Sequence, residues 1–76
     1  MSDRQHLIAG LESIVTAFDR RIADLHRHGR NELADGEYDE SRPYRVVLSA
    51  ERRYLEEETR EALALESLAW YATQTP

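Results

Sequence analysis

The chain has 76 residues, no Cys, and 15 acidic residues against ten basic ones, all of them Arg, which leaves a net charge of −5. This length allows one domain at most, and the lack of Cys removes disulfides as a source of stability. An acidic chain is repelled by phosphate backbones, so we expect no direct binding to DNA or RNA. The same charge suits docking on a basic protein surface.

The first residues are charged, and no apolar run has the length of a signal-peptide core or a membrane span. We therefore expect a cytoplasmic protein that makes no membrane contact. The sequence also shows no catalytic set, cofactor-binding loop or metal-ligand spacing of a known kind. It predicts a protein that is not an enzyme and that holds no cofactor or metal.

A long amphipathic helix is predicted over about residues 3–28. Ser2 and Gln5 have capping-box spacing, in which each side chain bonds the backbone N–H of the other residue. Large apolar residues then recur in steps of three and four, the spacing of one helix face: Leu7, Leu11, Ile14, Phe18, Ile22 and Leu25. Gly29 is well placed to end this helix.

Residues 29–41 are rich in acidic and turn-forming residues, and we expect them to form an acidic connection. The predicted partner-binding residues of this connection are Glu32, Asp35, Glu37, Tyr38, Asp39 and Glu40. They form either a solvated loop or a loop that docks on a partner protein. A calcium loop is not expected, because neither the Gly nor the final Glu of such a loop is in its place.

A second helix is predicted over about residues 42–73. Ser41 followed by Pro43 can begin it, because proline is favoured in the first turn of a helix. Apolar residues then share one face: Tyr44, Val47, Leu48, Leu55, Ala62, Leu65 and Ala69. A start at Ser49, with residues 45–48 extended, is the alternative.

Two helices joined by a short connection predict an all-α fold, a single antiparallel hairpin domain over residues 1–76. A connection at residues 29–41 places residues whose numbers sum to about 72 side by side, so that Ile14 lies near Glu58 and Arg21 near Glu51. The core of such a hairpin is small. We therefore expect a homodimer that forms a four-helix bundle.

Glu51 and Glu58 lie on the apolar face of the second helix, two turns apart. Buried carboxylates are costly, so we expect these two to reach Arg21 or solvent, or to fix the register of the helices. They could instead bind Arg residues of a partner. A further alternative is a helical-bundle enzyme or a carboxylate metal site built around them.

Large apolar side chains crowd the end of the second helix. At about 100° per residue they point in nearly every direction, so one neighbouring helix cannot cover them. The predicted interface for self-association or for a partner consists of Leu63, Leu68, Trp70 and Tyr71. Leu65 is a further large apolar residue in the same crowded region.

These patterns predict a non-catalytic protein–protein interaction module. It is expected to act as a small acidic inhibitor or adaptor that docks on a basic surface of another protein, with nucleic-acid-handling complexes as one class of partner. The alternatives are the enzyme or metal protein described above, and a subunit that folds only within a larger assembly.

Overall fold

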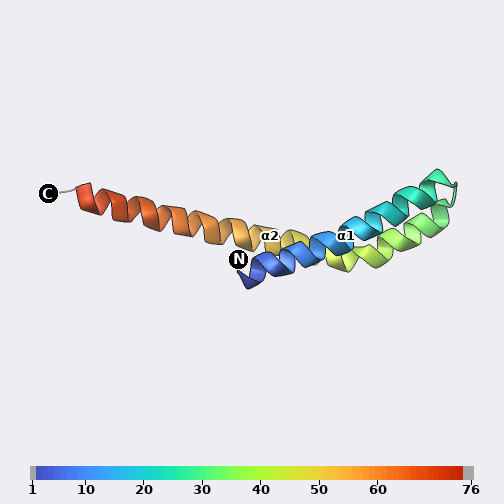
Figure 1. The fold of residues 1–76 in the computed structure, drawn as a ribbon, viewed down its shortest axis with the longest axis horizontal. Helices are drawn as coiled ribbons and strands as arrows, with labels where there is room; N and C mark the ends of the chain where they lie inside the picture. Colours follow the sequence, from blue (N-terminus) through green and yellow to red (C-terminus); the bar gives the residue numbers. More distant parts are fainter. Residues whose placement is uncertain (1, 75–76) are drawn as a thin grey trace.

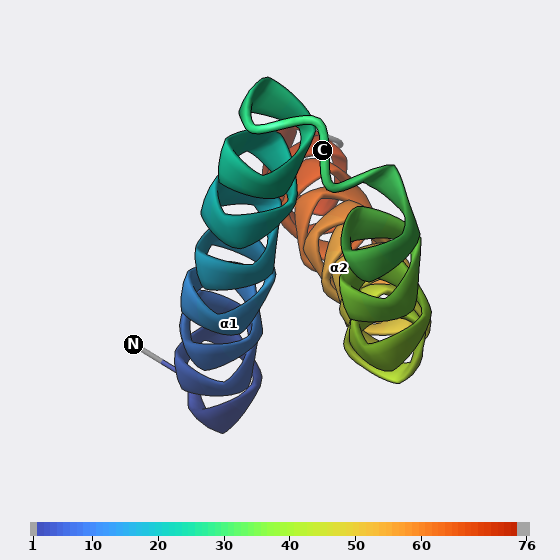
Figure 2. The ribbon, with the colours of Figure 1, turned by 90° about the vertical axis from the view of Figure 1, so that its right-hand side faces the viewer.

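The computed structural model describes residues 2–74 and contains two α-helices, α1 (Asp3–Arg27) and α2 (Asn31–Gln74) (Figure 1). The helices run antiparallel and are joined by a tight turn, so the predicted all-α hairpin is confirmed (Figure 2). In residues 2–74, no helix combines the length and apolarity that a membrane span requires.

Helix α1 begins and ends close to where the sequence predicts. The Ser2 hydroxyl accepts a hydrogen bond from the Gln5 backbone N–H at 3.2 Å, and the Gln5 side chain accepts one from the Ser2 N–H at 2.9 Å. At the other end Gly29 has a φ of 72°, a left-handed conformation that glycine adopts without strain. The Arg30 N–H then donates to the Leu25 carbonyl at 2.8 Å, which closes the helix with a Schellman motif.

Helix α2 begins at Asn31, so both predicted starts and the acidic connection at residues 29–41 are wrong. The chain reverses within residues 28–30, and Gly36 and Pro43 lie inside α2. Ala34 and Ser41 on this helix are fully buried. This burial stabilises helix where the local sequence alone favours a turn.

The core lies between the two helices. The three buried residues of α2 and the partly buried Leu55 are seven apart and form one stripe: Ala34, Ser41, Leu48 and Leu55. Leu48 forms the central cluster with Ile8 and Leu11 of α1. Nearer the turn, the ring of Phe18 lies 5.8 Å from the ring of Tyr44. The seven-residue spacing is that of a coiled-coil seam.

Ion pairs between the two helices flank this core. They join Arg4 to Glu51 and Glu58, Glu12 to Arg52, Asp19 to Arg45, and Arg21 to Glu37. The numbers of the paired residues sum to between 55 and 64 and not to about 72, so the predicted register is wrong. The reason is that α2 starts at Asn31, well before the predicted start near residue 42. Each α2 residue therefore lies opposite an α1 residue nearer the N-terminus than predicted. Arg21 therefore meets Glu37 instead of Glu51.

The molecule is a rod. Its extents are 70 × 19 × 15 Å and its radius of gyration is 19.6 Å, against about 11 Å for a compact domain of this length. The cause is the unequal length of the helices, because α1 has 25 residues and α2 has 44. The C-terminal part of α2 extends beyond the N-terminus of α1 (Figure 1).

Candidate protein–protein interface

The extended part of α2 is the most exposed region of the described chain. The Glu58 carboxylate is the last α2 group that an ion pair ties to α1, and we call residues 59–74 the free segment. Every residue of it is exposed. At 1.5 Å per residue the free segment is about 24 Å long. No other part of the described chain covers these residues. A helix of this length can therefore dock in a groove of another protein.

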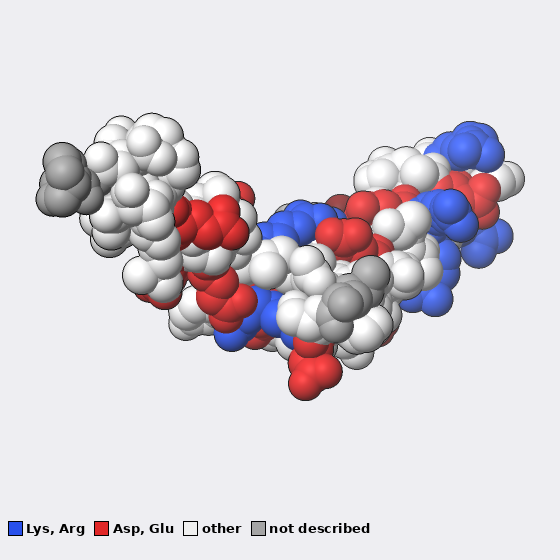
Figure 3. Space-filling model, turned by 60° about the vertical axis from the view of Figure 1, so that its left-hand side comes forward, with Lys and Arg blue, Asp and Glu red and all other residues white. Residues whose placement is uncertain are grey.

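The free segment carries the predicted interface residues. The exposed fractions are 58% for Leu63, 67% for Leu65, 65% for Leu68, 59% for Trp70 and 65% for Tyr71. Trp70 and Tyr71 meet edge to face, with their ring centroids 5.1 Å apart. The space-filling view shows this end of the rod as largely uncharged, whereas Arg residues gather at the opposite end (Figure 3).

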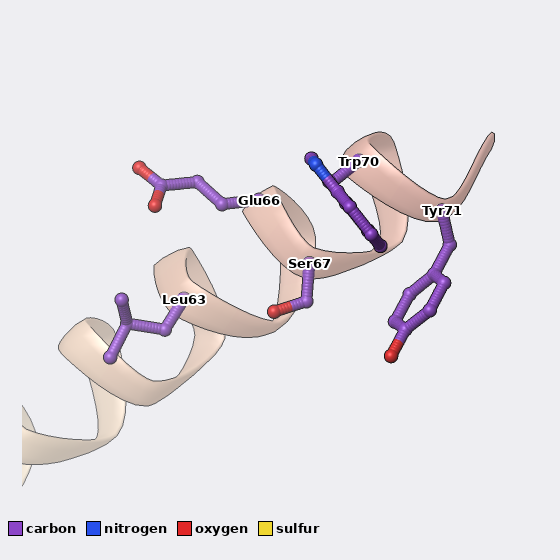
Figure 4. Close-up of a pocket in the computed structure, with 5 residues that line it drawn as sticks. All are labelled: Leu63, Glu66, Ser67, Trp70 and Tyr71. Atoms are coloured by element: carbon purple, nitrogen blue, oxygen red, sulfur yellow. The ribbon is translucent and has the colours of Figure 1, made fainter. Parts of the chain in front are cut away.

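Large apolar side chains lie on two different faces of the free segment. Leu63 and Trp70 are seven residues apart and share one face, which borders an open hollow lined by Leu63, Glu66, Ser67, Trp70 and Tyr71 (Figure 4). We call Leu63, Glu66, Ser67 and Trp70 the Trp70 face. Leu65 and Leu68 lie on roughly the opposite side, in line with Glu57 and Glu61. We call those four residues the Leu65 face.

The six residues predicted to form an acidic docking loop lie on several sides of α2 instead. Glu32, Asp35 and Asp39 are spaced by three and four residues on the side away from buried Ala34, and we call them the acidic ridge. All three are exposed. In the described part of the chain, Asp39 forms an ion pair with Arg42 of the same helix at 2.8 Å. The ridge therefore presents its acids to solvent.

The other three predicted residues have different surroundings. Glu37 turns toward α1, where its carboxylate lies 3.3 Å from the Arg21 guanidinium. The Tyr38 ring lies beneath the guanidinium groups of Arg42 and Arg45, at 6.0 and 4.8 Å. Glu40 is exposed but projects to a different side from the ridge. Glu37 and Tyr38 are thus engaged within the hairpin.

Glu51 and Glu58 share one partner, Arg4. The Arg4 guanidinium lies 2.6 Å from the Glu51 carboxylate and 3.0 Å from that of Glu58, and it also lies 5.1 Å from the centre of the Tyr54 ring. A fixed cation therefore occupies the position that a metal bridging these two carboxylates would take. Among residues 2–74, no group of three or more His, Cys, Asp or Glu side chains is placed to hold a metal.

Sequence reasoning missed the role of Arg4. The available signal is its position, because Arg4 precedes buried Ile8 by one turn and so lies on the stripe that faces α2. Which acids it meets depends on the register, and the predicted register was wrong.

Comparisons with known proteins gave no match to a protein-family model, to a curated protein or to a solved structure. A proposal on function therefore rests on the residues and geometry of this chain.

Proposed function

We propose that the protein is a non-catalytic protein–protein interaction module, a small acidic adaptor or inhibitor that docks on a basic surface of a partner protein. The observation that carries this proposal is the free segment, where large apolar side chains on more than one face are exposed. Contiguous exposed apolar surface on a small chain marks a binding site, because leaving it in water is unfavourable.

The acids supply the second part of the proposal, the charge of the partner. The acidic ridge places three carboxylates on the solvent side of α2, and on the Leu65 face Glu57 and Glu61 stand in line with Leu65 and Leu68. A partner that fits the Leu65 face has an apolar groove with basic residues around it. The acidic ridge lies about 30 Å further along α2 and meets a separate basic patch of the partner. Complementary charge of this kind speeds encounter and selects the partner.

Nucleic-acid-handling proteins form one class that carries such basic surfaces. A chain with a net charge of −5 competes for a surface of that kind by presenting carboxylates where phosphates would bind. An inhibitor that acts by occupying the surface needs no chemistry of its own.

The test compares two variants of equal net charge. In the first, the acidic ridge is neutralised by Glu32→Gln, Asp35→Asn and Asp39→Asn; in the second, three exposed acids outside the ridge and the Trp70 face are neutralised by Asp3→Asn, Glu40→Gln and Glu56→Gln. The wild type and the two variants are immobilised separately and exposed to a cell extract. The proteins that bind are then eluted with increasing salt concentration. We expect the ridge variant alone to lose the salt-sensitive bound fraction, because contacts between exposed charges are screened.

Equal losses in the two variants would show that the net charge, rather than the ridge, attracts the bound proteins. Capture that survives high salt and ridge neutralisation would overturn docking on a basic surface. Circular dichroism of both variants checks that the hairpin is intact, since none of the six acids forms an ion pair with α1 in the described structure.

A second candidate role, a subunit completed by a larger assembly, is favoured by the small core. Its buried hydrophobic residues in the described chain are Ile8, Leu11, Phe18, Ala34 and Leu48. A protein with so little buried surface gains much of its stability from whatever binds its folded form. Weak helicity and non-cooperative heat unfolding of the isolated chain support this role, and a cooperative transition at high temperature counts against it.

A further inference from the structure

The Trp70 face has the pattern of a coiled-coil hole. Its four residues, Leu63, Glu66, Ser67 and Trp70, stand at positions i, i+3, i+4 and i+7, the set that surrounds an inserted side chain when two helices pack. The small Ser67 lies between the larger ends of the set, and the hollow beside these residues is open (Figure 4). A helix presenting one apolar side chain therefore fits this face.

We propose that the helix that packs here is the free segment of a second copy of the chain, running antiparallel. Leu63 of each copy inserts into the Trp70 face of the other, so that residues whose numbers sum to about 130 lie opposite each other. This inference rests on the proposed function, because it names a second copy of the chain as one binding partner of the same free segment.

The surface area of the chain supports a partner of this size. The accessible surface is 6196 Å², whereas a compact monomer of 8.8 kDa exposes about 4,800 Å². The excess of roughly 1,400 Å² per chain is larger than the ~800 Å² that each partner buries in a standard interface. The chain therefore exposes enough surface for one interface of standard size and for a further open face.

The charges favour the antiparallel orientation. Glu56, seven residues before Leu63, lies on the side of the Trp70 face, and a parallel pair would place it beside Glu56 of the second copy. In the antiparallel pair it lies near Gln74 of the other helix, an uncharged residue, so this contact between like charges is avoided. The same arrangement brings Arg60 of one copy next to Trp70 of the other, a cation–π pair.

The pairing leaves the Leu65 face open. Leu65 and Leu68 lie on roughly the opposite side of the helix from Leu63, so the dimer still presents them to a different protein. Self-association and partner binding are therefore assigned to separate faces, and a substitution can affect one without the other.

The first test measures mass in solution by light scattering, for wild type, Leu63→Glu and the matched control Leu65→Glu. Both residues are exposed on the free segment, at 58% and 67%, so neither substitution disturbs the core of the hairpin. We expect wild type and the control to have twice the chain mass, and Leu63→Glu to have half of theirs. A monomeric wild type, or dissociation of the control variant alone, would overturn the proposal.

The second test uses the absence of Cys from the sequence, which makes single-Cys cross-linking specific. Under oxidation, Ser67→Cys is expected to form a disulfide-linked dimer, because Ser67 lies on the Trp70 face near the two-fold axis. Its neighbour Leu68→Cys, on the Leu65 face, is the control and is expected to stay monomeric on a denaturing gel. Preferential cross-linking of the Leu68→Cys variant would exclude the proposed face.

The two proposals fail in different ways. A monomer that still captures proteins through the acidic ridge refutes the dimer and leaves the proposed function standing. A dimer that captures the same proteins after the acidic ridge is neutralised supports the pairing of free segments and refutes the proposed docking on a basic surface.

Discussion

The guanidinium of Arg4 lies 2.6 Å from the Glu51 carboxylate, and it reaches Glu58 as well, at 3.0 Å. One side chain from the first turn of α1 thereby holds two successive regions of α2. The paired part of the hairpin ends at this contact, because the residues of α2 that follow Glu58 are all exposed. Arg4 therefore marks the boundary between the hairpin that supports the fold and the free segment proposed to bind.

The first prediction concerns the stability that Arg4 provides. Arg4→Ala is expected to lower the free energy of unfolding by about 1 kcal/mol, the upper end for partly exposed ion pairs, because Arg4 and Glu51 are less than a third exposed. Urea denaturation followed by circular dichroism measures it. Arg20→Ala, which removes an exposed Arg outside the described ion pairs, is the control and is expected to change nothing.

How much the sequence could predict differs between the two helices. The bounds of α1 follow from local signals, the capping box at Ser2 and the left-handed Gly29. The start of α2 does not, because Gly36, Pro43 and the clustered acids all favour a turn when read locally. Burial of Ala34 against α1 decides the outcome, and burial depends on the partner helix.

The candidate interface could also be predicted only in part from the sequence. The crowding of Leu63, Leu68 and Trp70 is visible in the sequence, and the structure shows these side chains exposed. That the free segment extends beyond α1 could not be predicted, because it depends on the register of the hairpin. The same register decides that Glu51 and Glu58 meet Arg4 instead of Arg21.

The second prediction tests the helical state of the former acidic connection. Gly36→Ala is expected to raise the free energy of unfolding by about 0.5–1 kcal/mol, because alanine loses less backbone entropy than glycine in a helix interior. A Cβ at this position meets no atom within 4 Å, so no clash offsets the gain. Thermal unfolding measures the change. A loss of stability would indicate that residue 36 is not in a helix.

The third prediction is the opposite effect at the turn. Gly29→Ala is expected to lower the free energy of unfolding by about 1–2 kcal/mol, since Gly29 has a φ of 72° and side-chain-bearing residues pay this cost in the left-handed region. A Cβ at residue 29 also meets no atom within 4 Å. The expected loss of stability therefore comes from the backbone conformation and not from a clash with neighbouring atoms. Gly29→Asn should recover part of the loss, because Asn tolerates this conformation.

The fourth prediction separates the core from the free segment. Leu48 is 4% exposed in the central cluster, and Leu48→Ala is expected to cost about 2–5 kcal/mol of unfolding free energy. Leu65→Ala removes the same atoms from a side chain that is 67% exposed and is expected to leave stability within about 0.5 kcal/mol. Chemical denaturation of both variants checks this. Comparable losses would mean that the end of α2 packs against the hairpin.

The fifth prediction concerns the free segment as a helix that depends on its partner. An isolated helix of sixteen residues without packing is marginal in water, so its backbone amides open readily in the monomer. Hydrogen exchange followed by mass spectrometry is expected to show slow exchange around Leu11 and Leu48 at every protein concentration. For peptides covering residues 60–74, exchange is expected to slow as concentration rises, because association buries the segment. The Leu63→Glu variant should lose this concentration dependence while exchange in the hairpin core stays unchanged. Fast exchange of residues 60–74 at all concentrations in the wild type would contradict pairing of the free segments.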